Sequence, residues 1–580
     1  MHLIDFLETK IAEVLTSLGY STEVKLNVSA RPDLGDYQYN GAFTFAKEYK
    51  KSPLVIADEI IGKLTGETAF KAVTNAGGFI NMTLSDEALV KYVNDVIKEP
   101  ALNKFIASNE CILLDYGGAN IAKELHVGHL RSANIGEALK RLYAYSGYET
   151  IGDVHLGDWG RPMGLIIREI KEMMPNLPYF DENFTGKYPE ECPVSIQDLN
   201  KIYPRASARA KEDEAYLNEA REITTALQNR HPGYFALWQA FSKISVADVK
   251  TIYDKLGCSF ELWEGEYSAD EFIPETLEYL KQTKLLRPSE GAMVIDVKEA
   301  DDKKEMPPVI VVNSAGGATY ATTDLATLYL RFKKYKLTKI FYITDFRQEL
   351  HFTQVFRAGY KTGIVPKTTE LEHLGFGTMN GPDGKPFKTR DGGVLSLNGL
   401  IELVKAETIK VIKDNIKEED KDALAEDLAI AAIKYADLLP NRASDYIFDP
   451  VKFSDLNGKT GPYLLYSTVR MGSLIKKCAT ANILPGEYKL MTTEAEREII
   501  LNLLKIKGVL EKSLNTKSLN ELAEFLYKLT NSFNAFYGEH EILKEQNKAV
   551  QISWLSLTKL VYDTNKTLLS LLALKVPAQI

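Results

Sequence analysis

The sequence predicts an α/β protein whose central domain is split by an insertion and followed by a helical region. A strand–helix–strand pattern covers residues 111–154, and strand patterns return between 309 and 344. From about 444 to the end the pattern is nearly all helical. Because 580 residues exceed what one hydrophobic core normally organises, we expect these regions to form separate domains.

Residues 1–107 are expected to form a small α+β domain. Apolar residues recur at helical spacing over 2–18 and 53–65, and turn-rich segments such as 30–36 separate the elements. The first helix carries acidic residues and lacks the basic start and apolar block of a signal peptide.

The central domain, expected over 108–443, begins with the apolar run Cys111-Ile-Leu-Leu-Asp115. A helical period follows Gly128, Gly147 ends that helix, and a second strand pattern covers 150–154. This order predicts two parallel strands joined by a crossover helix. Ligands bind at the carboxyl ends of such strands, which is where the sequence His-Val-Gly-His begins.

The second half of the central domain follows a mostly helical, charged insertion at about 166–300. The expected strands are 309–313, 317–321 and 339–344, and the expected helices are 322–336 and 348–361. Two such halves predict a Rossmann-type nucleotide-binding fold divided by an insertion. Residues 444–580 are expected to form an all-α domain.

The composition is that of an ordinary globular protein, with 45% apolar and 26% charged residues. The four cysteines include no Cys-x-x-Cys pair, which argues against a zinc site or a disulfide framework and favours a reducing, cytoplasmic location. No uncharged run reaches the length of a membrane span. The net charge of −9 excludes a generally basic surface but permits local basic patches.

Two histidines are the first candidates for chemistry. His126 and His129 lie three residues apart at a helix start, with Gly128 between them, so both rings face one side. A glycine lets a phosphate approach the backbone, and imidazole N–H groups can stabilise charge that develops on phosphate oxygens. Taken alone, the spacing would equally suit a metal pair or ordinary loop histidines.

A second candidate is the loop Gly-Pro-Asp-Gly-Lys-Pro-Phe-Lys-Thr-Arg-Asp-Gly-Gly at 381–393. Its glycines allow the movement that a closing loop needs, and Lys385 and Lys388 can meet phosphates. Such a loop alone is usually a solvated turn.

Together these segments resemble the arginyl-tRNA synthetase family of class I aminoacyl-tRNA synthetases. "NIAKELHVGHLRS" resembles the first class I signature, and Lys385–Thr389 resembles a variant Lys-Met-Ser-Lys-Ser loop with Pro386 and Phe387 at its second and third positions. "GDVHLGDWG", "TYATTDLA" and "GKTGPYLLYSTVR" extend the resemblance, and "RPDLGDYQYNGAFTFAK" is similar to the family's N-terminal domain. The resemblance covers nearly the whole chain.

The resemblance implies ATP-dependent activation of L-arginine and its transfer to the 3′-terminal adenosine of arginine tRNA, by a monomer, with Mg²⁺ on the phosphates. His126, Gly128 and His129 would meet ATP, with Lys385 and Lys388 as further phosphate ligands. In this family a lysine at the position of Lys123 can supply phosphate charge when the second loop lysine is missing. This chain has both, so Lys123 and Lys388 can be partly redundant.

For the amino acid, Asn120 and Gln348 resemble the residues that hold the α-ammonium and carboxylate groups. Asp115, Tyr320 and Asp324 resemble the side-chain pocket, and carboxylates suit a guanidinium because they accept its N–H groups in pairs. Without the resemblance, both aspartates would be interpreted as caps.

For tRNA, Tyr463, Tyr466 and Arg470 follow a helix start at Thr460-Gly461-Pro462 and share one face of a locally basic helix. Rings and a guanidinium can hold unpaired bases, although aromatic residues at this spacing are usually core. Phe79 and Asn81 resemble residues that meet the tRNA D-loop, and equally suit a buried strand.

Three rival functions remain. A class I synthetase for another amino acid, above all lysine, has the same fold, but the acidic pair disfavours apolar substrates. A small-molecule nucleotidylyltransferase shares the histidine signature but does not need about 130 further helical residues. A tRNA-binding paralogue without activity would not need His126, His129 and Lys388.

Overall fold

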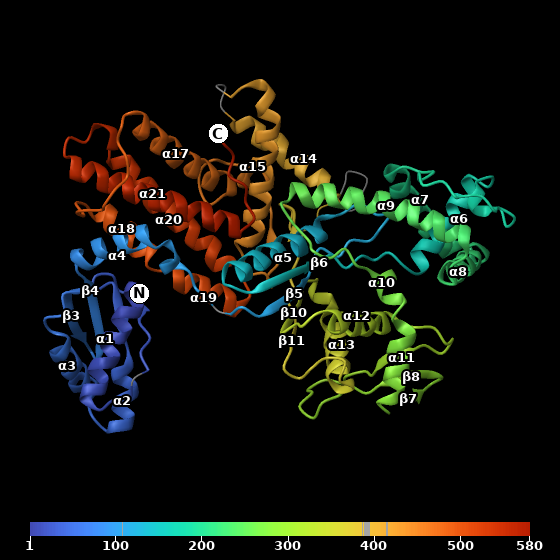
Figure 1. Cartoon of the computed structure of the whole chain (residues 1–580), viewed down its shortest axis with the longest axis horizontal. Coiled ribbons are helices and arrows are strands. Elements are labelled where there is room, and N and C mark those ends of the chain that lie inside the picture. The colour runs from blue at the N-terminus through green and yellow to red at the C-terminus, as the bar shows by residue number, and fades with distance from the viewer. Residues whose placement is uncertain (22, 107, 386, 388–394, 413–415) are drawn as a thin grey trace.

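The computed structural model describes residues 1–580 except 22, 107, 386, 388–394 and 413–415 (Figure 1). An α+β region, a central α/β region and a C-terminal helical region follow one another along the chain. In the part described, no helix combines the length and the apolar character needed to cross a membrane.

The N-terminal region is a four-stranded antiparallel sheet with helices packed on it. Its strand order is β1-β2-β4-β3. The elements are α1 (Leu3–Leu18), β1 (Asn27–Val28), β2 (Tyr37–Tyr39), α2 (Gly41–Tyr49), α3 (Pro53–Leu64), β3 (Phe70–Ala76), β4 (Phe79–Leu84) and α4 (Asp86–Lys98), followed by the short helix η1 (Pro100–Asn103). The two helices predicted from periodicity, at 2–18 and 53–65, are confirmed to within one residue at each end.

The central sheet is parallel throughout, with strand order β11-β10-β5-β6. Its strands are β5 (Cys111–Asp115), β6 (Glu149–Asp153), β10 (Lys339–Tyr342) and β11 (Glu370–His373), and α5 (Val127–Tyr145) is the crossover between the first two. Asp115 is in register with both Asp153 and Tyr342, so three strands end side by side. The predicted crossover unit and the split of the sheet between the two halves of the domain are confirmed.

Two of the predicted strands belong elsewhere. β9 (Val309–Val312) pairs with β8 (Ala292–Ile295) in a separate antiparallel sheet that also contains β7 (Leu286–Ser289). The strand predicted at 317–321 was wrong: only an isolated bridge at Ala318 forms there, and α12 (Tyr320–Lys334) begins two residues later. Thr319 ends the extended segment because it makes a reciprocal cap with Thr322.

The insertion is mainly helical, as predicted. It contains α6 (Arg161–Met173), η2 (Pro178–Phe180), α7 (Ile196–Glu212), α8 (Glu214–Gln228), α9 (Pro232–Lys255), α10 (Glu266–Asp270) and α11 (Ile273–Gln282). After α12 the central region continues with η3 (Phe346–Gln348), α13 (Glu349–Thr362) and β12 (Met379–Asn380).

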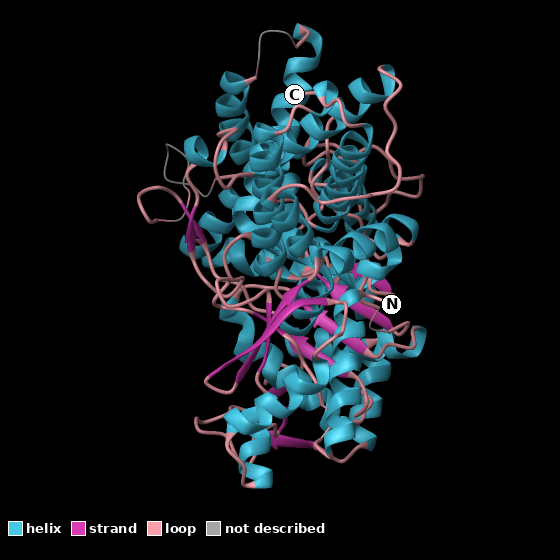
Figure 2. Ribbon diagram, turned by 90° about the vertical axis from the view of Figure 1, so that its left-hand side faces the viewer, coloured by secondary structure: helices cyan, strands magenta, loops and turns pink. Residues whose placement is uncertain are grey.

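The C-terminal region is helical apart from β13 (Tyr446–Ile447), which pairs with β12 of the central region. Figure 2 shows these helices stacked above the strands. They are α16 (Pro450–Phe453), α17 (Gly461–Thr480), α18 (Glu494–Leu503), α19 (Ile506–Thr516), α20 (Asn520–Glu539), η5 (Ile542–Lys544) and α21 (Lys548–Leu571). The helices α14 (Leu397–Thr408), η4 (Ile409–Val411) and α15 (Glu418–Leu438) precede them at the end of the central region. α17 starts after the cap Thr460, where the Thr-Gly-Pro signal predicted it.

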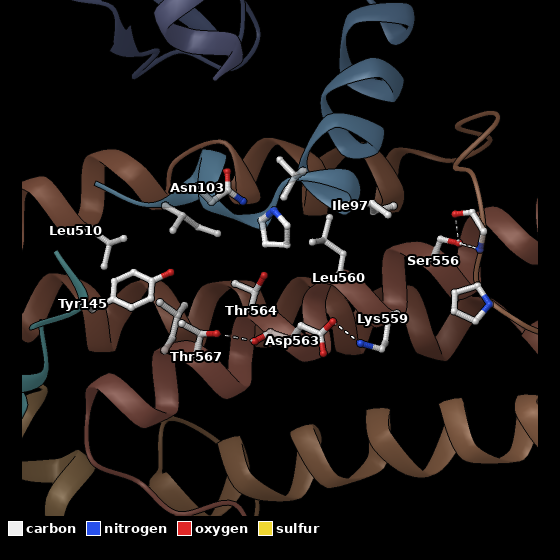
Figure 3. A pocket seen from close by; sticks show the side chains of 16 residues that line it. Ile97, Asn103, Tyr145, Leu510, Ser556, Lys559, Leu560, Asp563, Thr564 and Thr567 are labelled. Carbon is white, nitrogen blue, oxygen red and sulfur yellow. Dashed lines mark hydrogen bonds and ion pairs between the residues drawn. The ribbon is translucent and has the colours of Figure 1, made fainter. Parts of the chain in front are cut away.

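Alongside apolar residues that join both regions in one hydrophobic cluster, the N-terminal region rests on the C-terminal helices through polar contacts. They are the ion pairs Arg497–Asp36 and Lys507–Asp5, each at 2.6 Å, and two hydrogen bonds of 2.8 and 2.9 Å between the Asn94 amide and the backbone of Tyr488. Beside this joint lies an apolar cavity of about 380 Å³, lined by residues such as Ile97, Tyr145, Leu510 and Leu560 (Figure 3). None of the signature residues lines it, so the reactive site lies elsewhere.

Candidate active site

A cavity of about 610 Å³ opens at the carboxyl ends of β5, β6 and β10. This is the edge at which parallel α/β sheets bind ligands. Residues from three stretches of the chain line it: Asp115, Asn120, His126, Gly128 and His129 from the first, Tyr320 and Asp324 from the second, and Gln348 from the third. This cavity therefore brings together all the residues that the sequence assigned to arginine and three residues of the His-Val-Gly-His signature.

The two signature histidines are held in one tautomer by the start of α5. His126 is the N-cap, and its Nδ1 accepts from the Gly128 backbone N–H at 3.0 Å. His129 Nδ1 accepts from the His126 backbone N–H at 3.0 Å. A neutral imidazole whose Nδ1 is an acceptor carries its proton on Nε2. Both rings, with centroids 3.9 Å apart, therefore have an Nε2–H donor left for a ligand.

Both imidazoles are neutral at physiological pH. Desolvation, reinforced by His126 and Lys123, lowers the pKa of His129 to about 3, and desolvation also lowers the pKa of His126. A pair of neutral donors can approach phosphate oxygens without the repulsion that two adjacent imidazolium ions would cause. The arrangement suits hydrogen bonding to phosphate rather than general acid catalysis.

Two glycines make room for side chains of the site. A Cβ on Gly128 would lie 2.8 Å from Cε1 of the His126 ring, and a Cβ on Gly157 would lie 2.2 Å from Oδ1 of Asn120. The loop also holds Ala122 in the left-handed region, at φ +58°. Its backbone N–H donates to Ser245 of α9 at 3.1 Å, so the insertion holds this strained turn in place.

Asp115 has a partner of its own, which the sequence did not indicate. Arg331 of α12 is fully buried and donates to Asp115 at 2.6 Å and to Asp153 at 2.5 Å. Asp115 still lines the cavity, but its charge is shared with this internal guanidinium. Asp115, Asp153 and His155 are close enough to hold a metal ion, yet the Arg331 guanidinium already occupies one oxygen of each carboxylate, so the group does not suit Mg²⁺.

Asp324 is not a helix cap. It lies in the second turn of α12, whose cap is Thr319, and its carboxylate faces the cavity. His351 Nε2 of α13 is 2.5 Å from Asp324 Oδ2, and this hydrogen bond raises the pKa of His351. The carboxylate keeps further acceptor sites for a ligand.

Glu266 is a second acidic residue that sequence reasoning missed. It begins α10, lines the same cavity and lies close enough to Asp324 for their charges to interact. Desolvation raises its pKa to about 7, with the neighbouring carboxylates of Asp158 and Asp324 adding to the shift. Two carboxyl groups in a cavity, beside the phenol of Tyr320, are suited to a planar cation.

Of the predicted lysines that the structure describes, Lys123 and Lys385, neither lines the cavity. Lys123 Nζ lies 4.3 Å from the ring centroid of Tyr203, on insertion helix α7. Lys385 lies at the tip of the loop after β12, where its carbonyl accepts from the Gly381 N–H at 2.7 Å. Lys388 lies outside the described residues.

The predicted tRNA face of α17 packs half-buried against α20. The Tyr463 hydroxyl accepts from Asn534 at 2.6 Å, and Arg470 lies 4.6 Å from the ring centroid of Tyr537 and 5.7 Å from that of Tyr466. The three predicted residues do share a face, and each keeps some exposure to solvent.

The two N-terminal candidates differ in exposure. Phe79 begins β4 and is 39% exposed, next to Phe43 at a centroid distance of 4.6 Å. Asn81 is 1% exposed and accepts from Gln38 at 2.9 Å within the sheet. The buried-strand alternative therefore fits Asn81, and a direct contact of its side chain with tRNA is contradicted in this conformation.

Three families match successive parts of the chain. Residues 5–84 match "Arginyl tRNA synthetase N terminal domain", residues 66–450 match "tRNA synthetases class I (R), catalytic domain", and residues 464–580 match "DALR anticodon binding domain".

Relatives and solved structures agree with these matches. The chain is 41% identical to the arginine–tRNA ligase of Agathobacter rectalis over 99% of both chains, and 40% identical to that of Francisella tularensis subsp. novicida over 100% of both. Arginyl-tRNA synthetase from Plasmodium falciparum is 26% identical and superposes with a TM-score of 0.81 over 100% of this chain and 99% of that one. The Thermus thermophilus enzyme, 22% identical with a TM-score of 0.77 over 100% of both, shares the fold. The chain belongs to the arginyl-tRNA synthetase family.

Proposed function

We propose that the cavity at the carboxyl ends of β5, β6 and β10 carries out both steps of arginine attachment to tRNA. The chain is an arginine–tRNA ligase, which uses ATP to form arginyl-adenylate and then transfers the arginyl group to tRNA. The observation that carries the assignment of the site is the meeting of two Nε2–H donors with the acidic pair Glu266 and Asp324 in one cavity.

The arginine side chain lies between Asp324 and Glu266 in this proposal. A guanidinium offers five N–H donors in a plane, and two carboxylates can accept them from two sides. Tyr320, which is 72% exposed at the cavity edge, can cover the plane of the group. The earlier expectation that Asp115 supplies the second carboxylate is replaced by Glu266, because Asp115 is already paired with Arg331.

The α-ammonium and carboxylate groups of arginine are assigned to Asn120, Gln348 and Asp115. Asn120 lies directly over Gly157, and Gln348, which ends the short helix η3, also lines the cavity. The partial neutralisation of Asp115 by Arg331 leaves it an acceptor for an ammonium group without a full unpaired charge. These residues would orient the carboxylate of the substrate toward the histidines.

ATP lies against the start of α5, where His126, Gly128 and His129 present N–H donors and a flat backbone. A carboxylate oxygen of arginine attacks the α-phosphorus, the bond to the bridging oxygen breaks, and pyrophosphate leaves. The Nε2–H groups stabilise charge on the phosphate oxygens as it develops. Lys123, Lys385 and Lys388 are assigned to the phosphates after movement of the loop or of the Lys123 side chain.

Mg²⁺ is expected to arrive with the ATP phosphates, held by them and by water. In the second step a ribose hydroxyl of the terminal adenosine attacks the adenylate carbonyl, and AMP leaves. We assign Phe79, Tyr463, Tyr466 and Arg470 to tRNA. We further propose that the protein is a monomer with domains at 1–107, 108–443 and 444–580. Its four unpaired cysteines support a cytoplasmic location.

Two experiments test the proposal. Aminoacylation of total tRNA with each of the twenty amino acids should yield product with arginine alone, and charging with lysine instead would refute the specificity. Asp324→Asn keeps the shape of the side chain but removes a charged acceptor. It should raise KM for arginine by roughly 30-fold or more, as for the loss of about 2–5 kcal/mol in a buried charge pair, with KM for ATP nearly unchanged. Unchanged arginine kinetics would remove Asp324 from the pocket.

A further inference from the structure

A buried polar cluster connects the two signature segments of the active site. It consists of Arg131 and Asn134 of α5, Asp437 of α15 and Tyr446 of β13, and we call it the junction cluster. Arg131, Asn134 and Asp437 are each at most 1% exposed. None of the four residues lines the cavity, so the cluster has no direct contact with substrate.

Asp437 is the centre of the cluster. Its Oδ1 accepts from Arg131 Nε at 2.8 Å and from the Tyr446 hydroxyl at 3.0 Å, and its Oδ2 accepts from Asn134 at 2.9 Å. The Arg131 guanidinium also lies 5.0 Å from the ring centroid of Tyr446. Several directional bonds to one buried carboxylate leave little freedom for the elements that supply them.

The elements that meet here lead directly to the two signatures. Arg131 is two residues after His129 on α5, so it moves with the histidines. Tyr446 is in register with Met379 of β12, and its backbone N–H donates to Thr378 at 3.0 Å. β12 ends at Asn380, immediately before the loop that carries Lys385. A short rigid path therefore runs from the histidines, through Asp437, to the base of the lysine loop.

We infer that Asp437 and Tyr446 are positioning residues that set the distance between the signature histidines and the lysine loop for adenylate formation. The inference rests on the proposed function, because it takes Lys385 to act on the phosphates. Rate depends steeply on such distances, since a misplacement of about 1 Å can cost on the order of a hundredfold.

The test uses Tyr446→Phe, because a change at Asp437 would leave Arg131 buried without a counter-ion and endanger folding. Tyr446→Phe removes one hydrogen bond to a charged group and keeps both the ion pair and the ring. Tyr435→Phe is the matched control: it removes a buried hydroxyl on α15 that donates to Ala523 at 3.0 Å, away from the cluster. Thermal melting checks that both variants are folded.

ATP–pyrophosphate exchange is measured with arginine and arginine tRNA present. Tyr446→Phe should lower kcat roughly tenfold, the scale for one hydrogen bond to a charged group, with KM for arginine unchanged. The kcat of Tyr435→Phe should stay within about twofold of the wild-type value, which is well below the tenfold change expected for Tyr446→Phe. Equal effects of the two variants, or no effect of Tyr446→Phe, would overturn the inference.

A double-mutant cycle with Lys385→Ala separates positioning of the loop from general stability. If Tyr446 acts through the loop, its effect should shrink to less than about twofold once Lys385 is gone. Fully additive effects would refute the positioning role. If Lys385→Ala alone is silent, the proposed role of that lysine fails and the inference fails with it, whereas an active Lys385 with fully additive effects refutes the positioning role alone.

Discussion

Arginine binding should release a proton from Glu266, and the release can be measured. Glu266 has a pKa of about 7 in the free protein because it is desolvated beside other carboxyl groups. A bound guanidinium favours the carboxylate form and lowers that pKa. The contribution of Glu266 to arginine affinity is therefore present above pH 7 and lost as the pH falls through 7.

The magnitude follows from the fraction of protein with Glu266 ionised. The apparent dissociation constant is multiplied by 1 + 10^(pKa − pH), which is about 1.1 at pH 8, about 2 at pH 7 and about 11 at pH 6. The dissociation constant for arginine should thus rise roughly tenfold between pH 8 and pH 6. His129, with a pKa of about 3, does not titrate in this window.

His351 is the other group near Asp324 that can titrate in this range, because the hydrogen bond to Asp324 raises its pKa. Its protonation opposes a guanidinium, so it acts in the same direction as Glu266. The comparison is therefore made in His351→Gln, which keeps an N–H donor and removes the titration. In that background, Glu266→Gln should bind arginine more weakly at pH 8 and lose much less than tenfold more at pH 6, where the nearby Asp158, whose pKa desolvation raises to about 6, also titrates.

Isothermal calorimetry in two buffers of different ionisation enthalpy gives both affinity and proton release. With Glu266 present, roughly 0.9 proton per arginine should be released at pH 6 and roughly 0.1 at pH 8. A flat affinity with Glu266 intact would refute the assignment of this carboxyl to the guanidinium. A tenfold loss of arginine affinity between pH 8 and pH 6 that persists in Glu266→Gln would also refute this assignment.

Three other predictions follow from the site. His129→Ala should slow adenylate formation roughly 10²- to 10³-fold with KM for arginine little changed, and a variant with more than half of wild-type turnover would contradict the donor role. Tyr463→Ala should weaken tRNA binding by about 1–3 kcal/mol if the ring stacks on a base, whereas Tyr463→Phe should bind normally; an unfolded Ala variant or an unchanged KM for tRNA would place the ring in the core. ATP–pyrophosphate exchange should be silent without tRNA, as the family resemblance implies, and robust exchange with arginine and ATP alone would refute this.

Local patterns predicted the main elements well where one periodicity dominates. The crossover unit is an example, since β5 lies at 111–115 as predicted and α5 ends within two residues of Gly147. The prediction failed at 317–321, where the residues have a composition typical of a strand. A helix starts there instead, because Thr319 and Thr322 cap each other. The strand at 309–312 was found, but its partner β8 comes from the insertion, and periodicity does not identify partners.

The sequence predicted several residues that line the cavity but not the electrostatic interactions among them. The cavity contains the predicted histidines, Asn120, Tyr320, Asp324 and Gln348. Glu266 was missed because it lies in a short helix of a charged insertion, where a single additional acidic residue does not indicate a binding site. The pairing of Asp115 with Arg331 spans 216 residues of sequence, and such a partner is visible only once the fold brings the segments together.

The polar joint between the N-terminal region and the C-terminal helices has a consequence for the shape of the particle in solution. The more exposed pairs of this joint, Lys507–Asp5 and Arg497–Asp86, weaken as added salt screens them, whereas the buried contacts inside each region do not. The distance between the N-terminal region and the C-terminal helices should therefore depend on ionic strength. Small-angle X-ray scattering in rising potassium chloride should show the radius of gyration growing while circular dichroism stays constant, so salt would adjust the opening of the enzyme without unfolding any part of it.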